Sequence, residues 1–282
     1  MEKVDKKDNS AVTFVVFTYN EEKRIEWAIK NFEGWGHVLI VDNFSEDRTV
    51  EIAKSYGCEV LLNKNPGWCE DSETVAKVKA AVKSEWIYWG FADEVVGESA
   101  LAAIMEAVQS GKFRIVNIIR KNYYYGKFCH DAYAARLNRI FEKNAIDFSN
   151  NTIHHFGDVT VPESEICYLD PGRYYVHHFM ALNAKNWLHS MDRYSEIQST
   201  TYSGSFAELR IGVRLIKTLL GNYIVRGAYR AGFAGWALVI EMIYYECLLT
   251  MKSYERKRGL TVPEIEVLNN SARRALLNSG RA

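Results

Sequence analysis

The chain has 282 residues, of which 48% are hydrophobic and 25% are charged, and its formal net charge is +0. This balance supports a packed core and excludes the strongly basic surface that bulk nucleic-acid binding requires. The five cysteines form no Cys-x-x-Cys pair, so a zinc-knuckle motif is excluded and a reducing compartment is favoured. No uninterrupted apolar run is long enough to cross a bilayer, because Glu241 and Glu246 interrupt the best candidate, Phe233–Met251.

Short apolar runs alternate with helical patterns through the first half of the chain. Such alternation predicts a mainly parallel sheet covered by helices on both faces. The predicted strands are Val12–Phe17, Val38–Val41, Cys58–Leu62, Trp86–Trp89 and Phe113–Ile119. The helices predicted between and after them are Glu22–Phe32, Asp47–Tyr56, Asp71–Lys83 and Glu98–Gln109.

The second half divides into an irregular segment and a helical one. Lys121–Asp170 has many aromatic and turn residues, and a loop-rich region over a rigid sheet is a suitable place for an acceptor site. Tyr174–Phe179 predicts one more strand, and the chain then looks helical to its end. We therefore expect an α/β domain over residues 1–200 and a helical extension over residues 201–282.

One helix of the extension, Leu209–Leu220, is amphipathic and basic. Its apolar side carries Ile211, Leu215 and Leu219, and another side carries Arg210, Arg214 and Lys217. A basic amphipathic helix can lie on an anionic membrane, so contact through residues 209–251 is one interpretation. An ordinary helix docked on the domain with its charges in water is the other.

Three polar loops each follow a predicted strand directly. They are Thr18-Tyr19-Asn20, Asp42 and Ala92-Asp93-Glu94. In an open α/β sheet, ligands bind outside the carboxyl ends of the strands, so three polar loops at strand ends indicate one site.

The same segments resemble family-two glycosyltransferases, which have the GT-A fold. Phe14–Glu22 (FVVFTYNEE) and Val38–Ala53 (VLIVDNFSEDRTVEIA) resemble the family's opening strand, TYNEE and VDxGSTDRT patterns. Trp86–Glu94 (WIYWGFADE) resembles the WILxLDADE segment. The later matches are RLNR at 136–139, TIHH at 152–155, and His178-Phe179 followed by Trp187 and Arg193-Tyr194. Their order resembles the branch that adds sugars to lipopolysaccharide cores and similar bacterial glycans.

The resemblance implies an inverting enzyme of the hexosyltransferase type with a nucleotide-sugar donor, a UDP-sugar by default, and a glycan or lipid-linked acceptor. Donor-binding roles then go to Thr18, Tyr19, Asn20, Glu22, Asp42 and Asp93. A divalent cation, Mg²⁺ or Mn²⁺, usually neutralises the leaving diphosphate, and Asp93 and His178 are its implied ligands. Such an enzyme would be cytoplasmic, either free or at the inner face of the cell membrane.

Acceptor-side roles follow from the same resemblance. Inverting transfer needs a base to take the proton of the attacking hydroxyl, and the family position for it is occupied by His155. A neutral imidazole suits this task, while Asp158 and Glu163 are close enough in sequence to replace it. Arg136 and Arg139 are candidates for gripping a phosphate or an acidic acceptor, or for surface salt bridges.

Several positions depart from the family pattern. Phe91 replaces the first carboxylate of DAD, Phe44 replaces the glycine of VDxGSTD, and His155 replaces the glutamate of VHE. These departures keep open an alternative, a catalytically impaired GT-A-like protein that binds a nucleotide sugar, a glycan or a protein. A sugar nucleotidyltransferase is disfavoured because the loop after the first strand is acidic rather than glycine-rich and basic.

Overall fold

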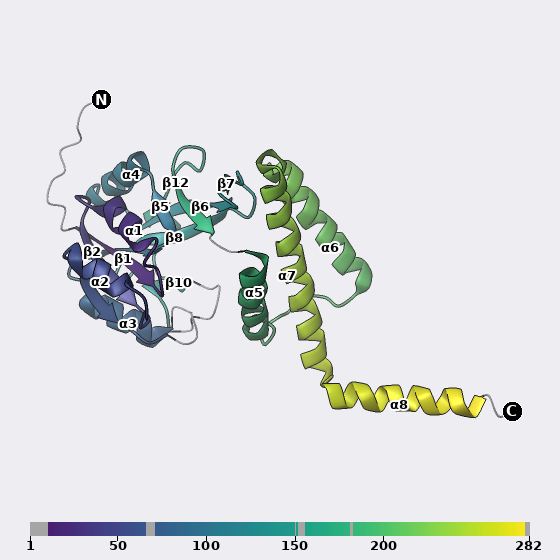
Figure 1. Ribbon diagram of the computed structural model, residues 1–282. Coiled ribbons are helices and arrows are strands. Elements are labelled where there is room, and N and C mark those ends of the chain that lie inside the picture. Colours follow the sequence, from purple (N-terminus) through teal and green to yellow (C-terminus); the bar gives the residue numbers. More distant parts are fainter. Residues whose placement is uncertain (1–10, 66–70, 150, 152–155, 181–182, 280–282) are drawn as a thin grey trace. The chain divides into compact units, whose positions relative to one another are not determined.

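The structure is a computed structural model that describes residues 11–65, 71–149, 151, 156–180 and 183–279 (Figure 1). The chain forms two compact units. The first comprises residues 1–181 together with 227–235, and the second comprises 182–226 and 236–282. The boundary expected at residue 200 falls inside the second unit, just after helix α5 (Ala184–Gln198).

The first unit is built on a mixed sheet with the strand order β3-β2-β1-β4-β8-β6-β12-β5. Strands β1, β2, β3 and β4 run parallel to one another, whereas β8 is antiparallel to both of its neighbours. The short strands β7 and β11 pair with β6, and β9 and β10 form a separate pair. The strands are β1 Val12–Thr18, β2 His37–Asp42, β3 Glu59–Leu62, β4 Trp86–Phe91, β5 Glu94–Val96, β6 Ile115–Tyr124, β7 Lys127–Phe128, β8 Ala135–Glu142, β9 Ile146–Asp147, β10 Asp158–Val159, β11 Ile166–Tyr168 and β12 Tyr175–Met180.

Helices cover both faces of this sheet, as the alternating pattern predicts. Helices α1 (Ile25–Phe32), α2 (Thr49–Ser55) and α4 (Glu98–Gln109) bury apolar residues against one face. Helix α3 (Ser72–Ala81) packs Val75 and Val78 against the other face, beside Trp89. The centres of β1, β2 and β4 are buried on both sides, which is why they read as continuous apolar runs.

The segment 121–170, expected to be irregular, contains the central strand β8. Its sequence, ARLNRIFE, mixes charged and apolar residues without a regular alternation. The reason is a register shift in the pairing with β6: Val116 lies opposite Ile140, but Ile118 lies opposite Leu137. A bulge of this kind breaks the two-residue period on which sequence-based strand assignment depends.

The second unit is helical. It contains α5, α6 (Glu208–Leu220), most of α7 (Phe233–Arg258) and α8 (Val262–Ser279), with a π-turn at Gly221–Val225 between α6 and α7. Helix α5 binds α7 through Lys252, whose Nζ lies 2.7 Å from Asp192 and 3.2 Å from Glu196. Trp187 of α5 is buried and contacts the Tyr244 ring of α7. Helices α6 and α7 run beside each other in Figure 1, joined by Arg214 and Glu246.

Among the described residues, one helix, α7, is long and apolar enough to cross a bilayer by length and composition alone. Of its most apolar window, 39% is buried inside the protein. Its interruption by Glu246 has a structural role, because this carboxylate accepts a hydrogen bond from Thr218 and lies 3.7 Å from Arg214 of α6. The core helix of a soluble protein meets the same criterion of length and composition.

Candidate active site

The carboxyl ends of β1, β2 and β4 lie side by side. Thr18 is paired with Asp42 and Phe17 with Phe91, so the polar loops that follow these strands meet at one edge of the sheet. Asp42 is fully buried, and its carboxylate accepts hydrogen bonds from the Thr18 hydroxyl at 2.9 Å and from the Ser45 backbone N–H at 2.8 Å. The Ser45 hydroxyl donates to Asp42 as well, so this carboxylate is held rigidly at the base of the site.

Asn20 and Glu22 join the first loop to the second. The Asn20 backbone N–H donates to Ser45 Oγ, and the Asn20 side-chain oxygen accepts from the Glu46 N–H, each at 2.8 Å. The Glu22 carboxylate accepts from the Arg48 N–H at 3.3 Å. Asn20 and Glu22, both predicted to bind the nucleotide-sugar donor, therefore fix the shape of the loops after β1 and β2. Tyr19 of the first loop is 38% exposed.

Phe44, which stands where the family pattern has glycine, has a φ of +58°. This is the left-handed region, which costs a residue with a Cβ about 1–2 kcal/mol and glycine much less. The family pattern has glycine here because the backbone adopts this left-handed conformation, and the present chain keeps the conformation with phenylalanine in its place. The Phe44 ring is 52% exposed next to Asp42, so it adds an aromatic surface to the loop.

Asp93 and His178 form the centre of the site. They come from the loop after β4 and from β12, and His178 Nε2 lies 3.3 Å from Asp93 Oδ2. The Phe179 N–H also donates to the Asp93 backbone carbonyl at 2.8 Å, which fixes the loop against β12. The structure therefore brings together the two residues that the resemblance implies as metal ligands.

Asn122 of β6 determines how the His178 ring presents its nitrogens. Its side-chain NH₂ donates to the carbonyl oxygens of Ala132 and Tyr133 at 3.2 and 3.1 Å, so its Oδ1 must face His178 Nδ1, 2.9 Å away. Because Oδ1 only accepts, Nδ1 carries a proton. The lone pair of Nε2 then faces the Asp93 carboxylate, an arrangement that is favourable only with a proton or a cation between them.

The charges around Asp93 favour its ionised form. Burial disfavours a charge there, but His178 when its Nε2 carries a proton, together with Arg24 and Arg120, outweighs burial and lowers the pKa of Asp93. The neighbouring Glu21 behaves in the opposite way. Burial raises the pKa of Glu21 to about 7, opposed by its ion pair with Arg24 and reinforced by the charge of Asp93. The negative charge of the site therefore concentrates on Asp93.

A buried cluster lies behind Asp93. Glu94 is 1% exposed, and its Oε1 lies 3.5 Å from Arg139 and 3.7 Å from Arg120. Arg139 also donates to the Trp89 carbonyl at 2.9 Å and stacks on the Phe91 ring. Phe91 thus replaces a carboxylate of the family pattern with an aromatic partner for Arg139, and the arginine is engaged inside the protein.

The other predicted acceptor-side residues are dispersed. Arg136 is exposed on β8, where it donates to Asn117 at 3.3 Å and lies over the Tyr168 ring. Asp158 is exposed on β10, paired with Asp147 of β9. His155 lies outside the described residues, as do the other three residues of the TIHH segment. The assignment of the base therefore stays a prediction.

Sequence reasoning assigned no role to Asn122, Glu21, Glu94 or Arg120. Asn122 lies 56 residues from His178, and only the parallel register of β6 and β12 places them opposite each other. Glu94 is visible in the sequence, because it directly follows Asp93 in the polar loop at the end of a strand. Among the described residues, no group of three or more His, Cys, Asp or Glu side chains gathers to hold a metal. A cation at Asp93 and His178 would take its remaining ligands from substrate oxygens and water.

Comparison with known families identifies the class. The model of glycosyl transferase family 2 matches residues 13–161, which is more than half of the chain and includes the loops after β1, β2 and β4. The chain therefore belongs to glycosyl transferase family 2, and the predictions of this family and of a GT-A-like fold with helical C-terminal segments are confirmed.

Individual relatives are distant. The chain is 26% identical over 121 residues to the SPbeta prophage-derived glycosyltransferase SunS of Bacillus subtilis, covering 42% of this chain and 28% of SunS. It is 22% identical over 238 residues to the uncharacterized glycosyltransferase RT0209 of Rickettsia typhi, covering 79% of this chain and 80% of RT0209. The crystal structure of S. aureus TarS 1–349 in complex with UDP-GlcNAc covers 88% of this chain and 92% of its own, with 12% identity and a TM-score of 0.45.

Proposed function

We propose that the chain is an inverting glycosyltransferase that moves a sugar from a nucleotide donor, a UDP-sugar by default, to a glycan or lipid-linked acceptor. One observation carries the proposal. Asp93 Oδ2 and His178 Nε2 lie 3.3 Å apart with the tautomer fixed by Asn122, beside the loops of Thr18 and Asp42. Family membership supports nucleotide-sugar chemistry at this edge of the sheet.

The residues fit a divalent cation. Asp93 offers a hard oxygen ligand, and His178, with its Nδ1–H held by Asn122, would offer the lone pair of Nε2 when a cation takes the place of a proton between the two residues. A cation bound there would neutralise the negative charge that develops on the departing nucleoside diphosphate. Thr18, Asn20, Glu22 and Asp42 would shape the wall for the base and ribose, and the exposed Phe44 ring would add an apolar surface.

On the acceptor side, a base would take the proton of the attacking hydroxyl as the glycosidic bond forms and the bond to the diphosphate breaks. We assign this role to His155, with Asp158 as the alternative. Positioning of both substrates would supply much of the rate. The order of the later motifs favours lipopolysaccharide cores or similar cell-surface glycans as acceptors. Reaction would then take place in the cytoplasm, at the inner face of the membrane.

A second candidate is a catalytically impaired relative that binds its ligand without transfer. It is favoured by Phe91, whose ring partners Arg139 instead of supplying a second carboxylate. Retention of donor binding without sugar transfer would identify this case.

Calorimetric titration with nucleoside diphosphates and nucleotide sugars, with and without Mn²⁺, tests the proposal. We expect one nucleotide to bind in a metal-dependent manner and Asp93→Ala to remove that dependence. Glu106→Ala, which removes an exposed carboxylate of α4, is the control and should leave it intact. If no nucleotide binds under either condition, the donor site does not exist and the proposal is wrong.

A further inference from the structure

Helix α6 presents an apolar stripe to solvent. Leu209, Val213, Ile216 and Leu220 recur at the spacing of one helix face, and Ile224 of the π-turn continues the line. Their exposed fractions are 81%, 44%, 58%, 48% and 56%. The helix buries none of its own residues completely. Its contacts with α7 are made from a different side, by Arg214 and Thr218. The stripe is therefore directed away from the packed side of the helix.

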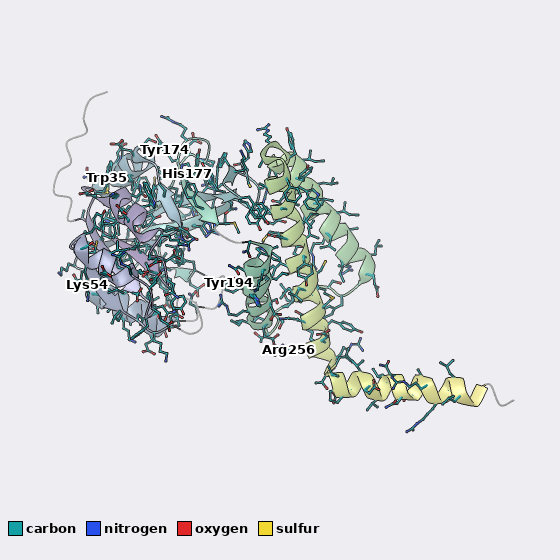
Figure 2. All side chains as sticks on the ribbon, in the orientation of Figure 1. Trp35, Lys54, Tyr174, His177, Tyr194 and Arg256 are labelled. Atoms are coloured by element: carbon teal, nitrogen blue, oxygen red, sulfur yellow. The ribbon has the colours of Figure 1, made fainter. Side chains whose placement is uncertain are left out.

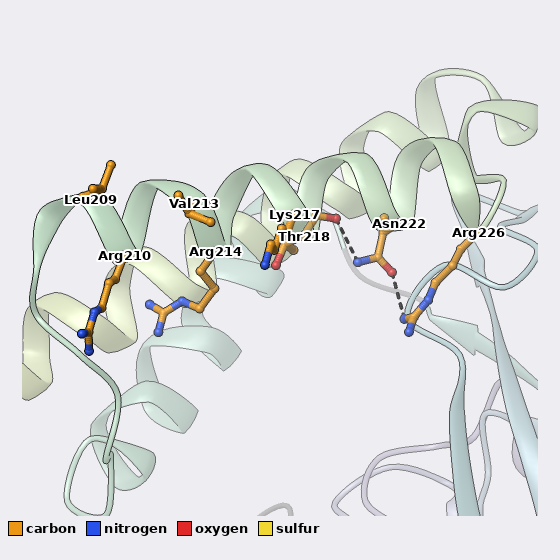
Figure 3. A pocket seen from close by; sticks show the side chains of 9 residues that line it. Leu209, Arg210, Val213, Arg214, Lys217, Thr218, Asn222 and Arg226 are labelled. Carbon is orange, nitrogen blue, oxygen red and sulfur yellow. Dashed lines mark hydrogen bonds between the residues drawn. The ribbon is translucent and has the colours of Figure 1, made fainter.

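A row of cations borders this stripe. Arg210, Arg214, Lys217 and Arg226 line an open groove of about 680 Å³ along α6 and the following turn, and Figure 3 shows the three arginine side chains extending from one side of the helix. Glu246 compensates Arg214 in part, at 3.7 Å. Among the described residues, no carboxylate pairs with Arg210 or Lys217, and Arg226 donates to the neutral Asn222.

From this combination we propose that α6 docks on a bilayer surface that contains anionic lipid headgroups. The apolar stripe would enter the boundary between headgroups and acyl chains, and the adjacent cations would contact the phosphates. A second copy of the chain is disfavoured as the occupant. A two-fold interface pairs the same patch on both subunits, so it would bring the uncompensated cations toward each other.

Vesicle flotation of the full chain tests the proposal. Two vesicle types are used, phosphatidylcholine alone and an equimolar mixture of phosphatidylcholine and phosphatidylglycerol. We expect the chain to float with the anionic vesicles only and to be released as salt is raised, since surface charge attraction is screened. Flotation that is equal on both vesicle types, or absent from both, would overturn the proposal.

Paired variants separate the two parts of the surface. Leu209→Glu with Ile216→Glu should abolish flotation, while Trp27→Glu, which changes an equally exposed apolar residue on α1, should not. Arg210→Gln with Lys217→Gln should weaken binding about 30-fold, from roughly 1 kcal/mol per cation. Lys54→Gln on α2 is the matched charge control. Unchanged flotation of both α6 variants would contradict the proposal.

Two further measurements control for misfolding and for self-association. Circular dichroism should show that every variant keeps its helix content, because the changed side chains are exposed. Light scattering should show the same mass for the wild type and the Leu209→Glu, Ile216→Glu variant; a dimer that this variant dissociates would assign the stripe to a second copy instead. Nucleotide titration of the same variants should be unaffected, so a failure of the donor site is distinguishable from a failure of membrane docking.

Discussion

At the residue scale, the position of one proton connects the sequence to the chemistry of the site. His178 is useful to a cation only through the lone pair of Nε2, and Asn122 keeps the ring proton on Nδ1 by accepting a hydrogen bond from Nδ1–H. Asn122 does not itself face Asp93. It acts as a positioning residue, held by the carbonyls of Ala132 and Tyr133.

Asn122→Leu should therefore weaken Mn²⁺ binding by about 10- to 100-fold, the usual effect of losing a partner that orients a metal-ligating histidine. Titration of Mn²⁺ in the presence of a nucleoside diphosphate measures it. Asn138→Leu, which removes a strand asparagine bonded to Asn117, is the control. Equal affinities in wild type and Asn122→Leu would show that the ring needs no such support.

Glu21 predicts a pH dependence of stability near the site. Its folded-state pKa of about 7 lies above the ordinary value of 4.5, because it is buried, so the fold favours the protonated form. This contribution is fully present below pH 4.5 and is lost as the pH rises through 7. Glutamine has no carboxyl group to ionise, so the stability of Glu21→Gln does not fall in this way as the pH rises.

As the pH rises through this range, we expect the wild type to lose about 2 kcal/mol of unfolding free energy relative to Glu21→Gln. This value is reduced for partial solvent screening. Urea unfolding of both proteins at acidic and mildly alkaline pH measures the difference. Glu106→Gln, at an exposed position of α4, gives the background pH dependence. A wild-type to variant difference that does not change with pH would contradict the expectation.

At the scale of elements, the Glu94 cluster links β5, β6 and β8 beneath the site. Glu94 lies near both Arg120 and Arg139, so Glu94→Gln would leave the buried Arg139 without its countercharge and remove one of the two countercharges of the half-buried Arg120. Breaking a buried ion pair in this way costs about 3–5 kcal/mol. Chemical denaturation should show a loss of this size.

The matched control for this cluster is Glu73→Gln. Glu73 forms an exposed pair with Lys77 on α3, and such pairs contribute about 0–1 kcal/mol. If Glu94→Gln and Glu73→Gln were equally mild, the buried cluster would have no structural role. Replacing Glu94 and Arg139 together by leucine and methionine should recover part of the loss, because the unpaired charge is then removed as well.

At the scale of the whole molecule, the two units differ in how the chain builds them. The first depends on sheet pairs between distant residues and recruits 227–235 from far along the sequence. The second consists of helices, and its last one, α8, is exposed along its described side chains. Figure 2 shows those side chains standing out from α8.

A chain that ends at Gly259 should therefore keep its unfolding midpoint within a few degrees and retain nucleotide binding. A domain of this size shifts by about 2–4 °C per kcal/mol, and exposed residues contribute little burial energy. Differential scanning calorimetry compares it with the full chain. A much larger decrease, or aggregation, would show that α8 covers a surface the rest of the chain needs.

The sequence by itself determined the family, the order of β1 to β4 with their helices, and the positions of Thr18, Asp42 and Asp93, because these depend on short-range periodicity and on residues next to strand ends. The tertiary structure alone decided that β8 enters the sheet, that Asn122 faces His178, and that Arg139 is enclosed with Glu94. These relations depend on strand register and on a bulge between segments far apart in the chain, which no local pattern encodes. Burial is a property of the assembled sheet, so two arginines of one motif, Arg136 and Arg139, differ in exposure and have different partners.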